Sequence, residues 1–275
     1  MAAYTETETL LTIDNVSKDY DGKTILKSVN AVIKDIHVEG TVTGQIVGFI
    51  GPSGLGKSTL FRIMAGLEKP SSGSIKLKGE IEVKAGDVGV VAQNYPLFAH
   101  RTVMSNLMLA ANKSVPKLST KEQQEKVITY LNDFDLSAEA NHYPCQLSGG
   151  QKQRCAILQQ ILCSNHFILM DEPFSGLDPI AKKKTEDLIR KIANMDELNT
   201  IIIVTHDIRA AAEISDHLWV MGRDHQPDGK IIPGAFIVKT YNLIDKGFAW
   251  HPETLEANSA FHSFVTEINN LFPSL

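Results

Sequence analysis

Hydrophobic residues near the start of the chain follow the pattern of β-strands. Residues 9–16 alternate in part between apolar and polar side chains, which predicts a strand. An Asp-Gly pair at 21–22 predicts a turn, and residues 25–38 predict the returning strand. Residues 45–50 form an apolar run that ends at a glycine, a pattern typical of a buried parallel strand.

The pattern changes in the middle of the chain. Between about residues 101 and 166 the β-branched runs become rare, and residues 121–131 and 151–162 predict helices. Two short apolar runs at 167–170 and 201–204 then predict further buried strands, with a helical sequence between them. Strands that alternate with helices favour an α/β fold with a parallel sheet. We therefore interpret the helical middle as an insertion into a sheet domain.

Composition excludes several classes of protein. The 275 residues suit one large domain or two small ones, and 43% hydrophobic with 21% charged residues is typical of a globular chain. A net charge of −5 argues against a nucleic-acid binder held by bulk positive charge. No apolar run reaches the length of a membrane-spanning helix, and the first residues do not resemble a secretion signal, so we expect an intracellular protein. The three cysteines form no CxxC pair, so neither a disulfide framework nor a zinc site is predicted.

One segment matches the phosphate-binding pattern G-x-x-x-x-G-K-[ST] without departure. It follows a predicted strand and opens a predicted helix, which is the structural context this pattern requires. Its glycines let backbone N–H groups surround a phosphate, its lysine reaches the β- and γ-phosphates, and its serine hydroxyl ligates Mg²⁺. The residues expected to bind the nucleotide are Gly51, Pro52, Ser53, Gly54, Leu55, Gly56, Lys57, Ser58 and Thr59.

Two carboxylates follow the predicted strand at 167–170. Asp171 and Glu172 stand at its carboxyl end, where open α/β sheets bind ligands, and Pro173 ends the strand. Taken alone, such a pair is more often an exposed turn. Together with the phosphate-binding segment, it predicts that Asp171 holds Mg²⁺ through water and that Glu172 orients or deprotonates the attacking water.

The sequence predicts a second helix N-terminus that can bind an anion, at Ser148, Gly149, Gly150 and Gln151. Ser148 is a favourable N-cap, and the two glycines leave bare N–H groups at the first turn. The phosphate-binding segment already serves one nucleotide. A second phosphate-binding end therefore makes most sense if it serves a nucleotide on another copy of the chain.

These segments together resemble the ATP-binding subunit of ABC transporters, over nearly all of residues 8–222. Segments of this chain resemble the family's motifs, in the family's order. They are residues 51–59 (Walker A), Gln93 (Q-loop), residues 147–154 (signature), residues 167–172 (Walker B), Asp178 (D-loop) and His206 (switch histidine). The resemblance implies an α/β P-loop NTPase fold. Its parts would be a RecA-like core sheet, an antiparallel β-subdomain and an inserted α-helical subdomain. It also implies a head-to-tail dimer that encloses two ATP molecules.

The resemblance also implies roles for single residues. Gln93 would contact Mg²⁺ and the attacking water, so the metal set becomes Ser58, Gln93 and Asp171. Glu172, His206 and Gln93 form the catalytic set, with His206 hydrogen-bonded to the γ-phosphate. Ser148, Gly149, Gly150, Gln151 and Asp178 would act on the partner's ATP. Tyr20 would stack on adenine, although Tyr4 is a second N-terminal tyrosine and a loop tyrosine can simply pack.

The implied domain boundaries are 1–230 for the ATPase, with the helical subdomain at about 99–165, and 231–275 for a short extension. Phe236–Val238 predicts a strand in that extension, and six residues from Phe261 to Phe272 form an apolar stripe at helical spacing. Packing on the chain's own core is the favoured interpretation of the stripe, over a membrane or partner contact. The sequence departs from the family at 158–160, where Leu-Gln-Gln replaces the common Ala-Arg-Ala.

The resemblance implies an ATPase subunit that drives import through separate permease subunits. Its partners would be a second copy or a homologous ATPase subunit, transmembrane permeases and a substrate-binding protein, without nucleic acid. Its cofactors would be ATP and Mg²⁺, and its location would be the cytoplasmic face of the cell (inner) membrane. Residues 95–98 and 101–103 resemble the polar amino acid and nitrate/sulfonate/taurine groups, with a lean to the second. The alternatives are an exporter or lipid-trafficking ATPase, and a non-transport ATPase such as an iron–sulfur assembly factor.

Three large apolar side chains, Tyr95, Leu97 and Phe98, lie close together just after Gln93. Such a cluster either packs into the core or docks onto another protein. The resemblance favours docking, because this region of transporter ATPases helps to form the groove that receives a short cytoplasmic helix of the permease.

Overall fold

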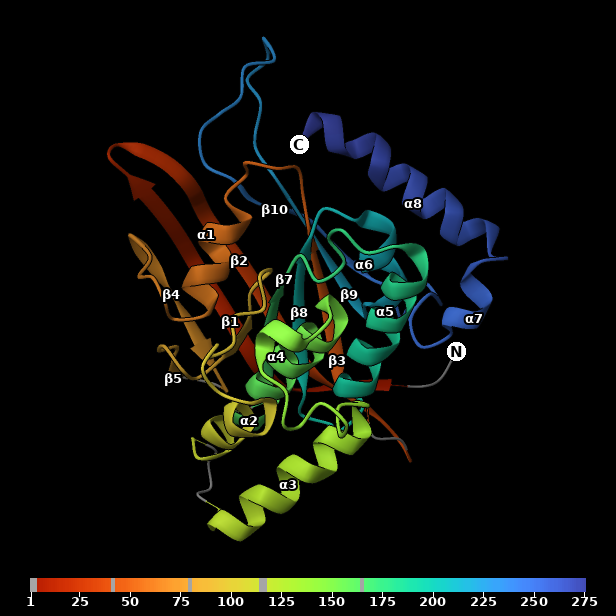
Figure 1. Ribbon diagram of the computed structural model, residues 1–275. Coiled ribbons are helices and arrows are strands. Elements are labelled where there is room, and N and C mark those ends of the chain that lie inside the picture. Colours follow the sequence, from red (N-terminus) through yellow and green to blue (C-terminus); the bar gives the residue numbers. More distant parts are fainter. Residues whose placement is uncertain (1–3, 41–42, 79–80, 114–117, 164–165) are drawn as a thin grey trace.

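The computed structural model describes residues 4–40, 43–78, 81–113, 118–163 and 166–275. Two sheets share one hydrophobic core, and helices cover the central sheet (Figure 1). The α/β fold with an antiparallel sheet and added helices confirms the predicted fold class.

The antiparallel sheet begins with a long hairpin. Strands β1 (Tyr4–Tyr20) and β2 (Lys23–Val38) are joined at Asp21 and Gly22, whose φ values are 48° and 78°. Positive φ at both turn residues suits the right-handed twist of the strands, which explains the Asp-Gly pair. The strand order is β2-β1-β4-β5, with β4 at Ser72–Leu77 and β5 at Ile81–Glu82.

The central sheet has the order β10-β9-β3-β8-β7-β6. Its strands are β3 (Gln45–Ile50), β6 (Gly89–Val91), β7 (Phe167–Asp171), β8 (Thr200–Thr205), β9 (His217–Gly222) and β10 (Phe236–Asn242). All neighbours pair in parallel except β10, which is antiparallel to β9. Every residue of β3 and β8 is buried, as the continuous apolar runs predicted. Because the strands are parallel, the carboxyl ends of β3, β7 and β8 meet at one edge.

The helices surround this sheet (Figure 1). They are α1 (Lys57–Met64), α2 (Val103–Ala111), α3 (Thr120–Asp133), α4 (Gly149–Cys163), α5 (Pro179–Ala193), α6 (Ile208–Ile214), α7 (Pro252–Leu255) and α8 (Ser259–Leu271), with 3₁₀ turns at Pro144–Gln146 and Phe272–Ser274. Ser119 and Glu122 form a capping box that starts α3. In Figure 1, α2 and α3 lie below the central sheet, and α4 lies between them and its strands.

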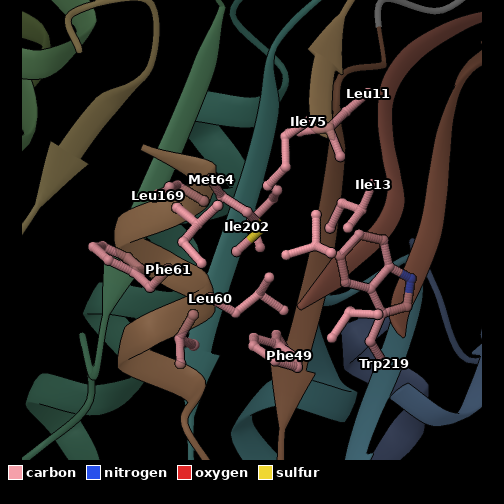
Figure 2. Close-up of a cluster of buried hydrophobic side chains, with 14 of the residues drawn as sticks. Leu11, Ile13, Phe49, Leu60, Phe61, Met64, Ile75, Leu169, Ile202 and Trp219 are labelled. Atoms are coloured by element: carbon pink, nitrogen blue, oxygen red, sulfur yellow. The ribbon is translucent and has the colours of Figure 1, made fainter. Parts of the chain in front are cut away.

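Helix α1 joins the two sheets. Figure 2 shows Leu60, Phe61 and Met64 of α1 among side chains from both sheets, including Phe49 and Ile75. Leu60 and Phe49 are fully buried. This packing fixes the helix that follows the phosphate-binding segment.

The end of the chain also packs on the core. Phe261, Phe264 and Ile268 of α8 are buried against α6, β9 and the segment after β10, which confirms the favoured interpretation of the apolar stripe. The strand predicted at Phe236–Val238 extends to Asn242 and completes the central sheet.

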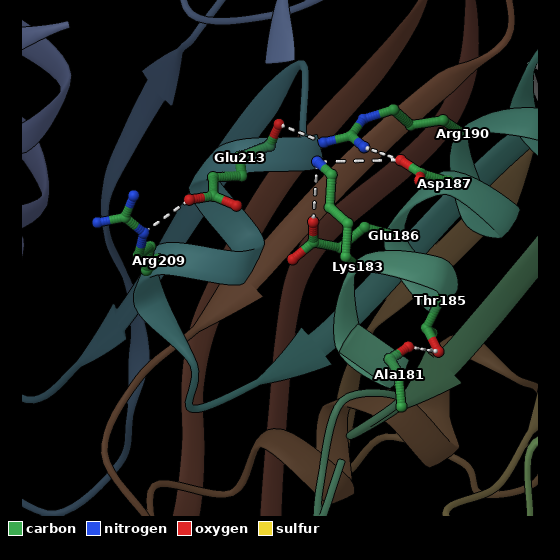
Figure 3. Close-up of polar contacts among 8 residues, drawn as sticks. All are labelled: Ala181, Lys183, Thr185, Glu186, Asp187, Arg190, Arg209 and Glu213. Atoms are coloured by element: carbon green, nitrogen blue, oxygen red, sulfur yellow. Dashed lines mark hydrogen bonds and ion pairs between the residues drawn. The ribbon is translucent and has the colours of Figure 1, made fainter. Parts of the chain in front are cut away.

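A polar network ties α5 to α6 (Figure 3). Arg190 donates to the backbone oxygen of Glu213 at 3.0 Å, and Arg209 pairs with the Glu213 carboxylate at 2.7 Å. The Glu186 side chain is only 3% exposed, and its nearest cation is the Lys183 ammonium at 3.5 Å. Burial, with the nearby Glu213 charge, raises the pKa of Glu186. The ionised form of Glu186 therefore destabilises the fold at this buried position.

Candidate functional site

A cavity of about 500 Å³ opens at the carboxyl edge of the central sheet. It is lined by Tyr20, Ile25, Ser53, Gly54, Gly56, Lys57, Ser58, Thr59, Gln93, Asp171, Glu172 and Val204. The structure therefore brings together most of the predicted phosphate-binding residues, the predicted adenine contact, Gln93 and both carboxylates. These residues are separated by up to about 180 positions in the chain.

The segment from Gly51 to Gly56 leaves β3 and turns into α1. Gly54 and Gly56 have φ values of 81° and 91°, a region that favours glycine. A side chain at Gly56 would also place its Cβ 2.6 Å from Ile25 Cγ2. The N–H groups of Thr59 and Leu60 both donate to the Gly56 oxygen at 3.0 Å and start the helix. The glycine pattern is thus required by the backbone path itself.

Lys57 lies inside this turn. Its ammonium donates to the Gly51 and Pro52 oxygens at 2.7 and 2.8 Å, and its residue is 9% exposed. Burial lowers the pKa of Lys57, whereas the charges of Glu172 and Asp171 raise it. Two backbone oxygens thus hold the side chain in place, with its charge near two carboxylates.

The two carboxylates have different surroundings. Within the described residues the Asp171 carboxylate makes no hydrogen bond, and burial together with the Glu172 charge raises its pKa. Glu172 has a φ of 48°, and Thr205 Oγ1 donates to its Oε2 at 2.9 Å. His206 reaches Glu172 Oε1 with its backbone N–H at 3.1 Å and its ring Nδ1 at 2.8 Å. Glu172 is oriented by the end of β8, while Asp171 keeps free lone pairs.

His206 lies beside Glu172 and outside the cavity lining, with 63% of its side chain exposed. Gln93 is exposed, and its amide donates to Ser175 Oγ at 3.2 Å. Gln93 therefore lines the cavity and His206 lies just outside it, and both bond residues of the turn that follows β7.

Tyr20 is 37% exposed at the cavity, and its hydroxyl donates to Glu68. Although burial opposes it, hydrogen bonds from Tyr20, Lys18 and Arg62 lower the pKa of Glu68 to about 2. Tyr4, the other N-terminal candidate, instead donates to Asp245 at 2.8 Å and does not line the cavity. The geometry favours Tyr20 as the aromatic contact.

The residues predicted to act on a partner do not line the cavity of their own chain. Ser148 Oγ accepts from Gln151 N–H at 3.3 Å, and Gln151 Oε1 accepts from Ser148 N–H at 2.8 Å. A Cβ on Gly149 or Gly150 would meet nothing within 4 Å, so this helix start faces open space. Asp178 caps α5 by accepting from two backbone N–H groups at 2.9 and 3.0 Å.

Residues 36–175 match the model of the family described as "ABC transporter". This chain belongs to the ABC transporter family. It is 36% identical over 214 residues to a sulfate/thiosulfate import ATP-binding protein, CysA, of Synechocystis sp., covering 76% of this chain and 57% of the relative. It is 36% identical to a probable ABC transporter ATP-binding protein, PEB1C, of Campylobacter jejuni, covering 81% and 89%. This ABC family member thus spans 57% of the length of the first relative.

Two solved structures show the same fold. The ATP-binding cassette MJ0796, a dimer bound to ADP and Pi, has a TM-score of 0.66 and 29% identity, covering 85% of this chain and 99% of that one. The cbiO1 protein of Clostridium perfringens, part of the ABC transporter complex cbiONQ, has a TM-score of 0.71 and 25% identity, covering 96% and 100%.

Several residues around this ABC site were not predicted from the sequence. Ile25 and Val204 line the cavity, Thr205 and Ser175 hold Glu172 and Gln93, and Arg223 donates to the Gly54 oxygen at 2.9 Å. Thr205 stands at the same strand end as His206, so the carboxyl-edge rule would have found it. No sequence pattern pointed to Arg223, because the loop that begins at this residue matches no motif.

The donors around Lys57 suit a divalent cation. Ser58 supplies a hydroxyl, Gln93 an amide oxygen, and Asp171 a half-buried carboxylate with unused lone pairs, which are hard oxygen ligands of the kind Mg²⁺ takes. The residues present therefore fit a magnesium site.

Proposed function

We propose that this chain is an ATPase subunit that hydrolyses ATP to drive import through separate permease subunits. The observation that carries the proposal is the cavity itself, which joins the glycine turn, Lys57, Asp171, Glu172 and Gln93. ATP-binding relatives of transport systems support it.

The positions of the residues support a role for each of them. Lys57 places a fixed positive charge against the transferred phosphate, where charge-assisted hydrogen bonds are strongest. Glu172 orients the attacking water and takes its proton, with Thr205 and His206 holding the carboxylate in line. Ser58, Gln93 and Asp171 would hold Mg²⁺, which would neutralise phosphate charge. Tyr20 stacks on the adenine.

The second part of the proposal is a head-to-tail dimer. The start of α4 is exposed and carries bare N–H groups that its own cavity does not use. In a dimer, Ser148, Gly149, Gly150 and Gln151 would bind the partner's ATP, with Asp178 at the same interface. The MJ0796 cassette, described as dimeric with ADP and Pi, supports this arrangement.

The third part concerns the membrane. No helix in the described stretches of the chain combines the length and hydrophobicity needed to cross a bilayer. We propose that the chain binds permease subunits from the cytoplasmic face, through a groove of about 500 Å³ lined by residues such as Leu97, Phe98, Leu109 and Lys113. A substrate-binding protein would complete the system. The resemblance to the nitrate/sulfonate/taurine and amino acid groups is not confirmed by the relatives, so the proposal names no cargo.

The test compares the wild-type chain with Lys57→Ala and Glu172→Gln. Lys57→Ala should lose hydrolysis and most ATP binding, whereas Glu172→Gln should bind ATP, hydrolyse it slowly and accumulate an ATP-bound dimer seen by light scattering. Wild-type turnover in Lys57→Ala would refute the proposal. Purification with membrane subunits distinguishes transport from a non-transport ATPase, and the direction of transport in vesicles separates import from export.

A further inference from the structure

Two glutamines of helix α4 bond the central sheet and the turn that follows β7. Gln153 and Gln160 are seven residues apart, which is close to two helical turns, so both project from one face of the helix. That face lies against the central sheet (Figure 1). The helix begins at the segment that we propose to serve a partner's ATP, so its attachment bears on how the two ATP-binding surfaces are related.

Gln153 is buried, with 3% of its surface exposed. Its Nε2 donates to the Pro173 oxygen at 3.0 Å, and its Oε1 accepts from Thr185 Oγ1 at 3.3 Å. The backbone acceptor fixes which end of the amide is the donor. Pro173 directly follows Glu172, whose own φ of 48° marks a tight turn. Gln153 therefore holds the turn that presents the proposed base.

Gln160 makes the complementary contact. Its Oε1 accepts from the Val90 backbone N–H at 3.0 Å. Val90 lies in β6, an outer strand of the central sheet that pairs only with β7 among the described strands, so this N–H faces away from the sheet. Three residues later the chain reaches Gln93. The resemblance to the family leads us to expect alanine at position 160, and an alanine side chain could not accept this hydrogen bond.

We propose that Gln153 and Gln160 are positioning residues for ATP hydrolysis. Two of their hydrogen bonds, to the Pro173 oxygen and from the Val90 N–H, fix α4 to the turn that carries Glu172 and to the strand that leads to Gln93. Neither side chain lines the ATP cavity, so they act through those two residues. This proposal rests on the proposed ATPase function.

The variants separate hydrogen bonding from packing. Gln153→Met and Gln160→Met keep the length of the side chain and remove its polar groups. Gln160→Glu keeps the oxygen that accepts from Val90 and should restore the contact. Gln123→Met is the matched control, because Gln123 is 5% exposed and also donates to a backbone oxygen, that of Leu118 at 2.9 Å, but within the helical region.

The measurements use the full chain. Phosphate release gives kcat and KM, a fluorescent ATP analogue gives the affinity, a thermal melt gives Tm, and amide exchange follows Val90. We expect each methionine variant on α4 to lower kcat about fivefold, the worth of one neutral hydrogen bond, with unchanged affinity for the analogue. Gln160→Met should also speed exchange at Val90. Gln160→Glu should keep wild-type kcat and exchange, and Gln123→Met should lower Tm without lowering kcat.

Several results would overturn the proposal. These are unchanged kcat in both methionine variants, an equal loss of kcat in Gln123→Met, or unaltered exchange at Val90 in Gln160→Met. A wild-type chain that binds ATP but never hydrolyses it would refute the proposed function, and with it this one. That result is distinct, because it appears before any variant is made.

Discussion

Replacing Phe98 by aspartate tests whether the segment after Gln93 binds the permease. The sequence left two alternatives for Tyr95, Leu97 and Phe98, namely packing into the core or docking onto a partner. The structure places the three residues differently. Tyr95 and Leu97 pack against the helical core cluster, whereas Phe98 is 48% exposed and touches His100 edge-on, with ring centres 6.2 Å apart. Phe98 is therefore the member of the cluster that remains available to a partner.

The exposure of Phe98 sets how much its replacement should change the stability of the fold. Full burial of a phenylalanine stabilises a fold by about 1.5–3 kcal/mol, so a half-exposed ring contributes about 1 kcal/mol. Its loss should lower Tm by about 2–4 °C. At a docking surface the loss of one large anchor costs about 2 kcal/mol or more, which is about a 30-fold weaker association.

The assay is co-purification of Phe98→Asp with the membrane subunits, run beside a thermal melt and ATP binding. We expect association and transport to fail while the melt and ATP binding stay near wild type. Leu107→Asp is the control, because Leu107 is fully buried in the core, does not line the groove, and its replacement should lower Tm much more. Intact association of Phe98→Asp would refute docking at this residue, and a collapsed melt would show that Phe98 belongs to the core.

Three further predictions concern the site and the fold. Ser148→Arg should abolish hydrolysis but retain ATP binding by the monomer, and stable mixed dimers with Lys57→Ala should regain one active site; inactive mixed dimers would argue against action on the partner's ATP. Tyr20→Ala should weaken ATP binding by about 1–3 kcal/mol, whereas Tyr20→Phe keeps the ring and should bind normally, as titration with ATP can show. Glu186→Gln should raise Tm at pH 8, because burial, with Glu213, raises the pKa of Glu186 in the fold and its ionised form is disfavoured there. The gain should vanish as pH falls through the folded pKa towards about 4.3, the unfolded value, and an equal gain at all pH values would contradict this reasoning.

Local patterns predicted the parts of the fold that depend on local chemistry. The buried strand β3 and the glycine turn after it were predicted because both carry their constraint in consecutive residues. The length of the first strand of the hairpin was underestimated. A strand was predicted at residues 9–16, but β1 runs over Tyr4–Tyr20. Its first residues include Thr5 and Glu6, which show no apolar alternation and are held by pairing with His37 and Ile36 of β2. A local sequence pattern cannot predict that pairing, because it depends on residues of the other strand.

The short helices show the same limit. Helix α2 has apolar residues all round, so it lacks the one-sided stripe that marks a surface helix. It is stabilised instead by burial and by Asn106, whose amide bonds three backbone oxygens in the preceding turn. In the site, likewise, motifs predicted Glu172 and Gln93, but not that Thr205 and Ser175 would hold them. Such pairs depend on how distant strands are placed.

The start of α4 shows how one local structure can serve both the fold and a partner. Its cap is complete within the chain, since Ser148 and Gln151 bond each other's backbone N–H groups. Among the described residues the N–H groups of Gly149 and Gly150 have no partner, so an anion can bind them without breaking the cap. Neither glycine has a positive φ, and a Cβ on either would meet no atom within 4 Å. The fold of the single chain therefore does not require glycine at these positions, and the absence of side chains leaves their N–H groups open to the close approach of an anion.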